Sequence, residues 1–261
     1  MIFSFGWRCR GCSTVRNIFT MAQSKSAPFS IDLGAMRIKY KTKNDTFSES
    51  DLVSKDPILQ FKHWFDIARE TPGILEANAM CLCTCTKDGF PSARYVLLKG
   101  YGKDGFKFFT NYSSRKGIEL TQNPRAALVF YWEPLKRSVR IEGNVEKLSD
   151  EESDNYFHSR PKESQISACS SNQSTVIQSR SVLTDKETEL KMKYSNDTDV
   201  IPRPENWGGY IVIPHSIEFW QGQSDRMHDR VRFRHLKENE QLDEEIVHKG
   251  EDGWVYERLS P

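Results

Sequence analysis

The chain has 261 residues, of which 37% are hydrophobic and 28% are charged, so it can bury a substantial core. Its 37 basic and 36 acidic residues almost cancel, and no uninterrupted apolar run approaches the roughly 18 residues of a transmembrane helix. We therefore expect neither nucleic acid nor a membrane as partner, and any site for an anion must be a local cluster of basic residues.

Residues 1–30 differ in composition from the rest of the chain. They contain several serines and four basic residues, and the first acidic residue is Asp32. This composition is typical of a mitochondrial transit peptide. The alternative is a disordered tail on a cytoplasmic protein.

The first predicted element is an amphipathic helix from Pro57 to Glu70. Ile58, Phe61, Phe65 and Ile67 fall near one face of it, and proline suits its first turn. We expect this face to pack against the core.

The pattern then becomes strand-like, with Asp-Gly turn signals at residues 88–89 and 104–105. The predicted strands are 79–86, 92–99, 106–110, 126–132, 138–148, 207–213, 217–222, 227–233 and 254–259. Short strands with tight turns indicate an antiparallel meander, which closes most easily as a barrel. The predicted fold class is mainly β with peripheral helices (α+β).

Further helices interrupt these strands. One is predicted at 114–121, and a second begins after Ser149, which opens a capping box. The second helix should carry Tyr156 and Arg160 on one face, because they are four residues apart. The polar segment 184–206 is predicted to be a helix followed by a linker.

Cys81, Cys83 and Cys85 alternate along the predicted strand 79–86, so they share one face of it. No histidine lies near them in the sequence, and a metal or redox site is the less favoured interpretation. We expect three small buried hydrophobic side chains, and no metal site.

A first candidate anion site lies where the strand ending at Thr110 gives way to the helix at 114–121. A helix N-terminus offers unpaired N–H groups, and Arg115 and Lys116 add positive charge. Arg94 strengthens the case, because a charge inside an apolar strand is costly unless it faces a partner. The alternative is an ordinary N-cap followed by solvated basic residues.

A second candidate site combines Tyr156, Arg160 and Ser164 with Lys99 from the strand 92–99. Arginine binds phosphate oxygens with two nitrogens at once, and the hydroxyl groups add neutral donors. The alternative is an ordinary surface helix.

A third cluster contains Trp220, Gly222, Arg226, His228 and Arg230. Tryptophan can pack against a flat ring, and glycine allows a close backbone approach. The three alternating basic residues would point to one side of a strand and would repel one another unless an anion or electron-rich ring lay there. The alternative is a polar outer face, on which nearby aspartates partly relieve the repulsion among the basic residues.

Together these segments resemble the pyridoxine-5'-phosphate oxidase (pyridoxamine 5'-phosphate oxidase) family. No single segment decides the match, but their order and number make it specific, from about Leu33 to Pro261. The matching segments are 94–99, 109–111, 114–116, 132–135, 156–161, 173–174, 220–230 and 256–261.

The resemblance implies an FMN-binding split β-barrel and a homodimer with active sites at the interface. With the extension at 1–30 inferred from composition as disordered or targeting, the chain divides further into a lid segment at 31–56 and an oxidase domain at 57–261 that includes a C-terminal dimerisation portion. The implied FMN contacts are Arg94, Tyr95, Val96, Leu97, Phe109, Thr110, Arg115, Lys116, Ser138, Gln173, Ser174, Trp220 and Arg230.

The implied activity is oxidation of pyridoxine 5'-phosphate and pyridoxamine 5'-phosphate by O2 to pyridoxal 5'-phosphate, in vitamin B6 salvage. H2O2 is formed, and the amine also releases ammonia. Arg226 and His228 are the implied catalytic residues and should hold the pyridine ring over the flavin. The implied substrate contacts are Arg37, Tyr40, Lys99, Tyr156, Arg160, Ser164, Arg226, Met227 and His228.

Two positions depart from the family pattern. Many relatives have glutamine where this chain has Ser138, and the shorter side chain puts the implied flavin contact in question. Met227 stands where leucine is usual, a swap that conserves volume. Two other functions stay open: a non-catalytic carrier of FMN or pyridoxal phosphate, and a split-barrel flavin reductase that uses a nicotinamide.

Overall fold

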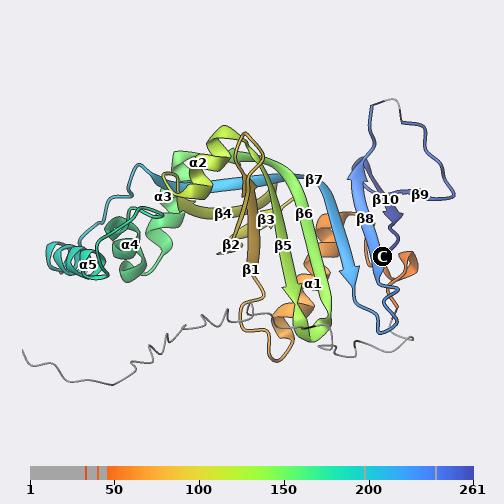
Figure 1. Ribbon diagram of the computed structural model, residues 1–261, viewed down its shortest axis with the longest axis horizontal. Coiled ribbons are helices and arrows are strands. Elements are labelled where there is room, and N and C mark those ends of the chain that lie inside the picture. The colour runs from red at the N-terminus through yellow and green to blue at the C-terminus, as the bar shows by residue number, and fades with distance from the viewer. Residues whose placement is uncertain (1–32, 34–39, 41–45, 197, 239) are drawn as a thin grey trace, which may run out of the picture. The chain divides into compact units, whose positions relative to one another are not determined.

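The computed structural model describes residues 33, 40, 46–196, 198–238 and 240–261 (Figure 1). Residues Lys39–Pro261 form one compact unit. Its helical segments are η1 Glu49–Asp51, α1 Pro57–Glu70, α2 Arg115–Gln122, η2 Glu133–Leu135, α3 Asp150–Ser159, α4 Lys162–Ser170 and α5 Ser181–Lys193. Its strands are β1 Ala79–Cys85, β2 Pro91–Leu97, β3 Gly100–Gly102, β4 Gly105–Asn111, β5 Arg125–Trp132, β6 Arg137–Lys147, β7 Trp207–Gln221, β8 Asp229–His235, β9 Val247–Lys249 and β10 Trp254–Arg258.

The strands form one antiparallel sheet in the order β2-β1-β5-β6-β7-β8-β10-β9, with β3 and β4 joined to it through β7. This confirms the prediction of a mainly β fold with peripheral helices. None of the helices that the structure describes has both the length and the hydrophobicity to cross a bilayer.

Strand β7 organises this sheet because it changes partner along one edge. One edge pairs with β6 over Tyr210–Gln221, while the other pairs with β4 over Trp207–Val212 and with β8 over Ser216–Gln221. The register of β6 and β7 shifts at Gly143, which pairs with Pro214. Such an irregularity bends a strand and increases its twist. The predicted strands 207–213 and 217–222 are therefore one bent strand.

Helix α1 forms the aromatic centre of the core, and its bounds agree with the prediction. Its buried Phe61 packs against Phe106 and Phe130, with ring centroids 5.1 and 5.3 Å away. Trp64 meets Phe219 of β7 at 5.3 Å. The helix thereby covers the inner face of the sheet on both sides of the β7 bend.

Helices α3, α4 and α5 enclose a second, smaller apolar cluster with Trp207 (Figure 1). Helix α3 ends at Ser159, and Arg160 is extended at φ −78°, ψ 152°. A residue that precedes proline is driven out of the helical region, and Pro161 follows. The prediction that Arg160 lies on a helix face is therefore wrong.

The cysteines of β1 do not lie in the core. Met80 and Leu82 are fully buried on one face of the strand, whereas Cys81, Cys83 and Cys85 are half-buried on the other. The three cysteines stay partly exposed because the apolar core covers only the face of the strand that carries Met80 and Leu82.

Replacing Phe61 by alanine should lower the free energy of unfolding by about 3–5 kcal/mol, because it removes a fully buried ring and leaves a cavity. Denaturant unfolding would measure the loss. Leu59→Ala is the control on the same helix, since Leu59 is 48% exposed. A loss for Phe61→Ala no larger than for Leu59→Ala would contradict this account of the core.

Candidate active site

A cavity of about 920 Å³ lies between the edge strand β2, the end of β4, and the helices α2, α3 and α4. Among the described strands β2 ends the sheet order, so its outer edge leaves backbone groups available to a ligand. Most residues predicted to bind FMN line this cavity: Arg94, Tyr95, Val96, Leu97, Phe109, Thr110, Arg115, Lys116, Gln173 and Ser174. So do four predicted substrate residues, Lys99, Tyr156, Arg160 and Ser164.

Lys116 is a buried cation at one end of this cavity, and only neutral groups hold it. Its Nζ donates to Gln173 Oε1 at 2.7 Å, Thr110 Oγ1 at 3.0 Å and Ser114 Oγ at 3.2 Å, and its side chain is buried. These acceptors are neutral, and the described residues place no carboxylate within ion-pair distance of it. Burial, and next the charge of Arg94, lower the pKa of Lys116 to about 8. An anion would compensate this ammonium.

Arg94, predicted to face an anion or to reach outward from an edge, turns toward β1 and α2. Its Nη1 donates to Leu82 O at 3.1 Å and to Thr84 Oγ1 at 2.5 Å, and its Nη2 lies 3.5 Å from Glu119 Oε2. The side chain still lines the cavity wall. The strand therefore tolerates this charge through internal partners.

Arg160 is the second cation of the cavity. It lies over the Trp207 ring, with Cζ 4.9 Å from the centroid, and Tyr156 stacks on Phe109 at 3.9 Å beside it. Burial lowers the pKa of Arg160, and its buried Nη1 has no hydrogen-bond partner among the described residues. A buried donor without an acceptor is costly, so an anionic ligand fits this position.

The remaining predicted FMN contacts lie elsewhere in the subunit. Ser138 and Trp220 line a second cavity of about 360 Å³ on the face of β5, β6 and β7. Ser138 Oγ donates to Phe130 O at 2.8 Å, and Arg230 Nε donates to Glu218 Oε1 at 2.7 Å. Within one subunit these residues do not join the first cavity.

The predicted catalytic residues lie in the turn between β7 and β8. The prediction of a strand at 227–233 is wrong at its start, because Met227 still belongs to the turn and donates its N–H to Asp225 Oδ1 at 3.0 Å. The preceding residue, Arg226, is left-handed at φ 67°. Strand β8 begins only at Asp229. Arg226 and His228 are therefore presented by a loop, and alternation along a strand does not explain their placement.

His228 is held by its backbone surroundings and by aromatic neighbours. Its Nδ1 accepts Gln223 N–H at 3.0 Å, so the neutral ring carries its proton on Nε2. Its ring lies 4.9 Å from Trp220 and 6.1 Å from Tyr40, a predicted lid residue. A Cβ on Gly222 would lie 2.8 Å from the Trp220 ring, so glycine permits this packing. Arg37, the other predicted lid residue, lies outside the described residues.

Sequence reasoning missed two buried acids of these sites. Glu119 follows Arg115 by four residues on α2, a spacing that indicates a helical ion pair. Glu218 pairs with Arg140 across β6 and β7, and Arg140 Nη2 donates to it at 2.6 Å. Arg140 Nε also lies 3.0 Å from Glu142 Oε1. The four-residue spacing of Arg115 and Glu119 can be recognised in the sequence. The pair of Arg140 and Glu218 cannot, because it depends on the register between two strands.

Comparison with known proteins identifies relatives along most of the chain. Residues 70–194 match the family described as pyridoxamine 5'-phosphate oxidase, and residues 207–261 match the pyridoxine 5'-phosphate oxidase C-terminal dimerisation region. The chain is 59% identical over 232 residues to a pyridoxine/pyridoxamine 5'-phosphate oxidase of Bombyx mori, covering 89% of this chain and 90% of that protein. It is 56% identical over 232 residues to pyridoxine-5'-phosphate oxidase of Bos taurus, covering 88% of each.

A solved structure is similar in fold. The crystal structure of PhzG from Burkholderia lata 383 in complex with tetrahydrophenazine-1-carboxylic acid has a TM-score of 0.70 to this chain. The two are 29% identical, and the match covers 82% of this chain and 97% of that one.

Affinity for inorganic phosphate should fall as the pH rises above about 8, because Lys116 must be protonated to attract the anion and its pKa is about 8. Bound phosphate would itself favour the proton and move the fall to somewhat higher pH. Titration calorimetry between pH 7 and about pH 10 would measure it. Lys116→Met should weaken binding at pH 7 and remove most of the pH dependence. An unchanged pH profile in Lys116→Met would show that Lys116 does not hold the anion.

Proposed function

The chain belongs to the pyridoxamine 5'-phosphate oxidase family, and on that premise we propose that it oxidises pyridoxine 5'-phosphate and pyridoxamine 5'-phosphate to pyridoxal 5'-phosphate. FMN is the cofactor, O2 the electron acceptor and H2O2 a product, and the amine also yields ammonia. The observation that carries the proposal is one cavity with two cationic positions, Lys116 and Arg160, neither of which has a carboxylate partner among the described residues. FMN and the substrate each bring one phosphate.

The Lys116 end of the cavity fits FMN. Lys116 and the N-terminal turn of α2 would hold its phosphate, and Arg115, whose Nη atoms have no hydrogen-bond partner among the described residues, adds donors. The outer edge of β2 along Tyr95–Leu97 would lie beside the flavin ring. When bound, FMN supplies the hydride acceptor and passes the electrons to O2. The buried ammonium supports this assignment.

The Arg160 end fits the substrate phosphate. Its free Nη1 offers a charged donor, and Lys99, Tyr156 and Ser164 surround the same part of the cavity. Charge-assisted hydrogen bonds of this kind are short and strong where water is excluded. Recognition of the phosphate here would fix where the substrate's reacting carbon lies.

Arg226 and His228 would position the pyridine ring. With Nδ1 engaged by Gln223 N–H, neutral His228 presents its Nε2–H as a donor. Met227 is 66% exposed and would contribute apolar contact. We also assign Arg37 and Tyr40 to closure over the substrate, and the contact of Tyr40 with Trp220 and His228 supports this for Tyr40.

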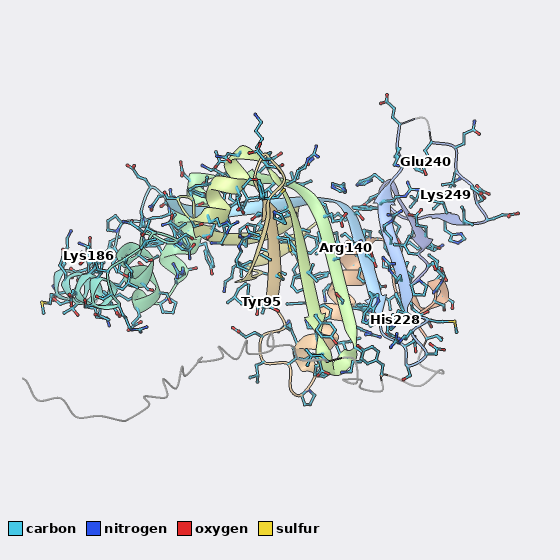
Figure 2. The ribbon with its side chains drawn as sticks, in the orientation of Figure 1. Tyr95, Arg140, Lys186, His228, Glu240 and Lys249 are labelled. Atoms are coloured by element: carbon cyan, nitrogen blue, oxygen red, sulfur yellow. The ribbon has the colours of Figure 1, made fainter. Side chains whose placement is uncertain are left out.

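The active site is proposed to form between two subunits. In the strand order β1, β5 and β6 separate β2 from β7, so the cavity and the catalytic turn arise on different parts of the sheet. Figure 2 shows Tyr95 and His228 on these two parts, and Tyr95 is 82% exposed although it lines the cavity. The partner would bring Ser138, Trp220 and Arg230 to the flavin. The match of residues 207–261 to a dimerisation region supports this arrangement.

A cytoplasmic location is proposed for the enzyme. The basic, serine-containing composition of residues 1–30 supports mitochondrial import as the alternative, and these residues lie outside the described part of the chain.

Purified protein incubated in air with pyridoxine 5'-phosphate and FMN, without a nicotinamide, should form peroxide and pyridoxal 5'-phosphate together. Arg226→Ala should lower kcat by about 100-fold or more while the yellow flavin stays bound, because positioning is lost and FMN binding is not. Arg125→Ala, at an exposed arginine, is the control. Absence of both products would favour a carrier, and a need for a nicotinamide would favour a reductase.

Mixing two inactive variants should restore activity if the active site is shared. Arg160→Ala damages the cavity half and Arg226→Ala damages the turn half, so a heterodimer of the two contains one intact site. Random exchange of subunits should recover about a quarter of wild-type activity. Assays before and after subunit exchange would show it. No recovery, despite heterodimers detected by mass spectrometry, would place both halves in one subunit.

A further inference from the structure

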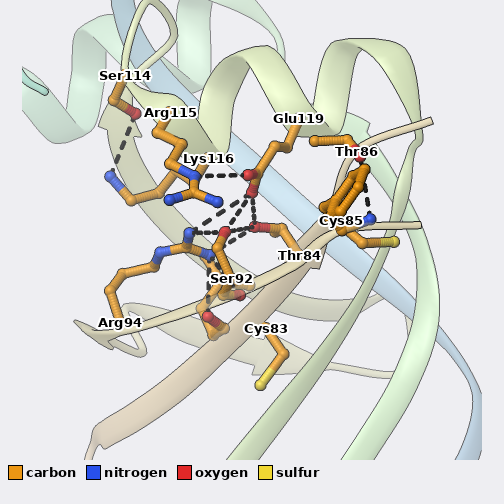
Figure 3. A network of polar contacts seen from close by, with 12 residues as sticks. Cys83, Thr84, Cys85, Thr86, Ser92, Arg94, Ser114, Arg115, Lys116 and Glu119 are labelled. Carbon is orange, nitrogen blue, oxygen red and sulfur yellow. Dashed lines mark hydrogen bonds and ion pairs between the residues drawn. The ribbon is translucent and has the colours of Figure 1, made fainter. Parts of the chain in front are cut away.

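One buried carboxylate lies behind the Lys116 end of the cavity. Glu119, on α2, is 3% exposed. Its Oε2 accepts Thr84 Oγ1 and Ser92 Oγ, each at 2.5 Å, and its Oε1 accepts Arg115 Nε at 2.9 Å. Figure 3 shows it reaching from the helix toward the strands β1 and β2, where the Arg94 guanidinium approaches.

This carboxylate is kept charged at a buried position. Burial alone would raise the pKa of Glu119, but hydrogen bonds from Ser92, Thr84 and Arg115 outweigh burial and lower it to about 2. Glu119 does not line the cavity. It must therefore affect a ligand there through the groups that it holds.

Those groups include two of the three cations at this end of the cavity. Glu119 binds Arg115 through Nε, which leaves both Nη atoms for an external anion. It also lies 3.5 Å from Arg94 Nη2. Lys116, the third cation, instead uses neutral acceptors. The carboxylate thus fixes the arginines and leaves the lysine without a negative partner.

We propose that Glu119 is a positioning residue that presents Arg115 to the phosphate of FMN and holds the charge of Arg94 beside it. This inference rests on the FMN location proposed above. Three cations and one carboxylate leave a net charge of +2 at this site, which matches the dianion of a phosphate monoester near neutral pH. The arrangement selects a flavin that carries a monoester phosphate over one without it.

The test compares FMN with riboflavin, which has the same ring and no phosphate. Glu119→Gln keeps the side chain's size and removes its charge. It should weaken FMN about tenfold, because the arginines lose their charged tether, and change riboflavin affinity by less than about twofold. Flavin fluorescence titration of the full chain gives both dissociation constants. Equal weakening of both flavins, or unchanged FMN affinity, would overturn the proposal.

Control variants separate this role from stability. Glu187→Gln removes a partly exposed carboxylate, paired with Lys191 on α5, and should change the affinity for neither flavin. If Glu119→Gln fails to fold, the double variant Thr84→Val/Ser92→Ala is the alternative. It keeps the Glu119 carboxylate but removes two of the hydrogen bonds that hold it. It should also lower the affinity for FMN more than the affinity for riboflavin. Equal loss of both flavins in that variant counts against the proposal.

A double-mutant cycle tests whether Glu119 acts through Arg115. In an Arg115→Ala background, Glu119→Gln should weaken FMN by clearly less than in the wild type. A full additional loss would contradict action through Arg115. Lys116→Met and Arg115→Ala distinguish the premise from the inference. If both leave FMN affinity unchanged, the proposed FMN location is wrong; if both weaken FMN and Glu119→Gln does not, only the role of Glu119 is wrong.

Discussion

The partner change along β7 is the constraint on which the rest of the structure depends. At Gly143 a side chain would meet the carbonyl of Ile213, with a Cβ only 2.2 Å from that oxygen, so glycine permits β6 to follow the bend of β7. Before the bend β7 pairs with β4, which contributes to the cavity wall, and after it β7 pairs with β8 and leads into the turn proposed to be catalytic. One strand therefore fixes both halves of the site. It also holds them apart within a subunit, which is why the proposed active site needs a second copy.

Charge is distributed unevenly between these halves. In the cavity, Lys116 and Arg160 face neutral groups, so their desolvation is uncompensated until an anion binds. In the other half, Arg230 and Arg140 share the buried Glu218, and the hydrogen bond to Glu218 raises the pKa of Arg230. Glu218 and Glu142 together balance these two arginines, so this half offers an anion little net attraction. This difference supports the proposal that both phosphates bind in the cavity and that the C-terminal half provides contacts to rings.

The sequence predicted those parts of the fold that depend on local pattern. The observed bounds of helix α1 agree with the predicted ones because its apolar spacing, its first-turn proline and its Asp56 N-cap all indicate the same helix. Arg160 lines one cavity with Tyr156, as predicted, but it does so from beyond the helix, since Pro161 forces it out of the helical conformation. The alternation of Arg226, His228 and Arg230 suggested one face of a strand, but alternation cannot reveal a left-handed residue such as Arg226. The pairing of Glu218 with Arg140 depends on the register between β6 and β7, which a single sequence does not reveal.

The separation of the two halves has a thermodynamic consequence. If the flavin contacts Lys116 of one subunit and Trp220 of the other, as proposed, it binds the dimer more tightly than a single subunit, so by linkage its binding stabilises the dimer. Saturation with cofactor then tightens association, and dilution releases cofactor and subunit together. In such a protein the supply of vitamin B2 would help to determine how much of the vitamin B6 enzyme persists in assembled form.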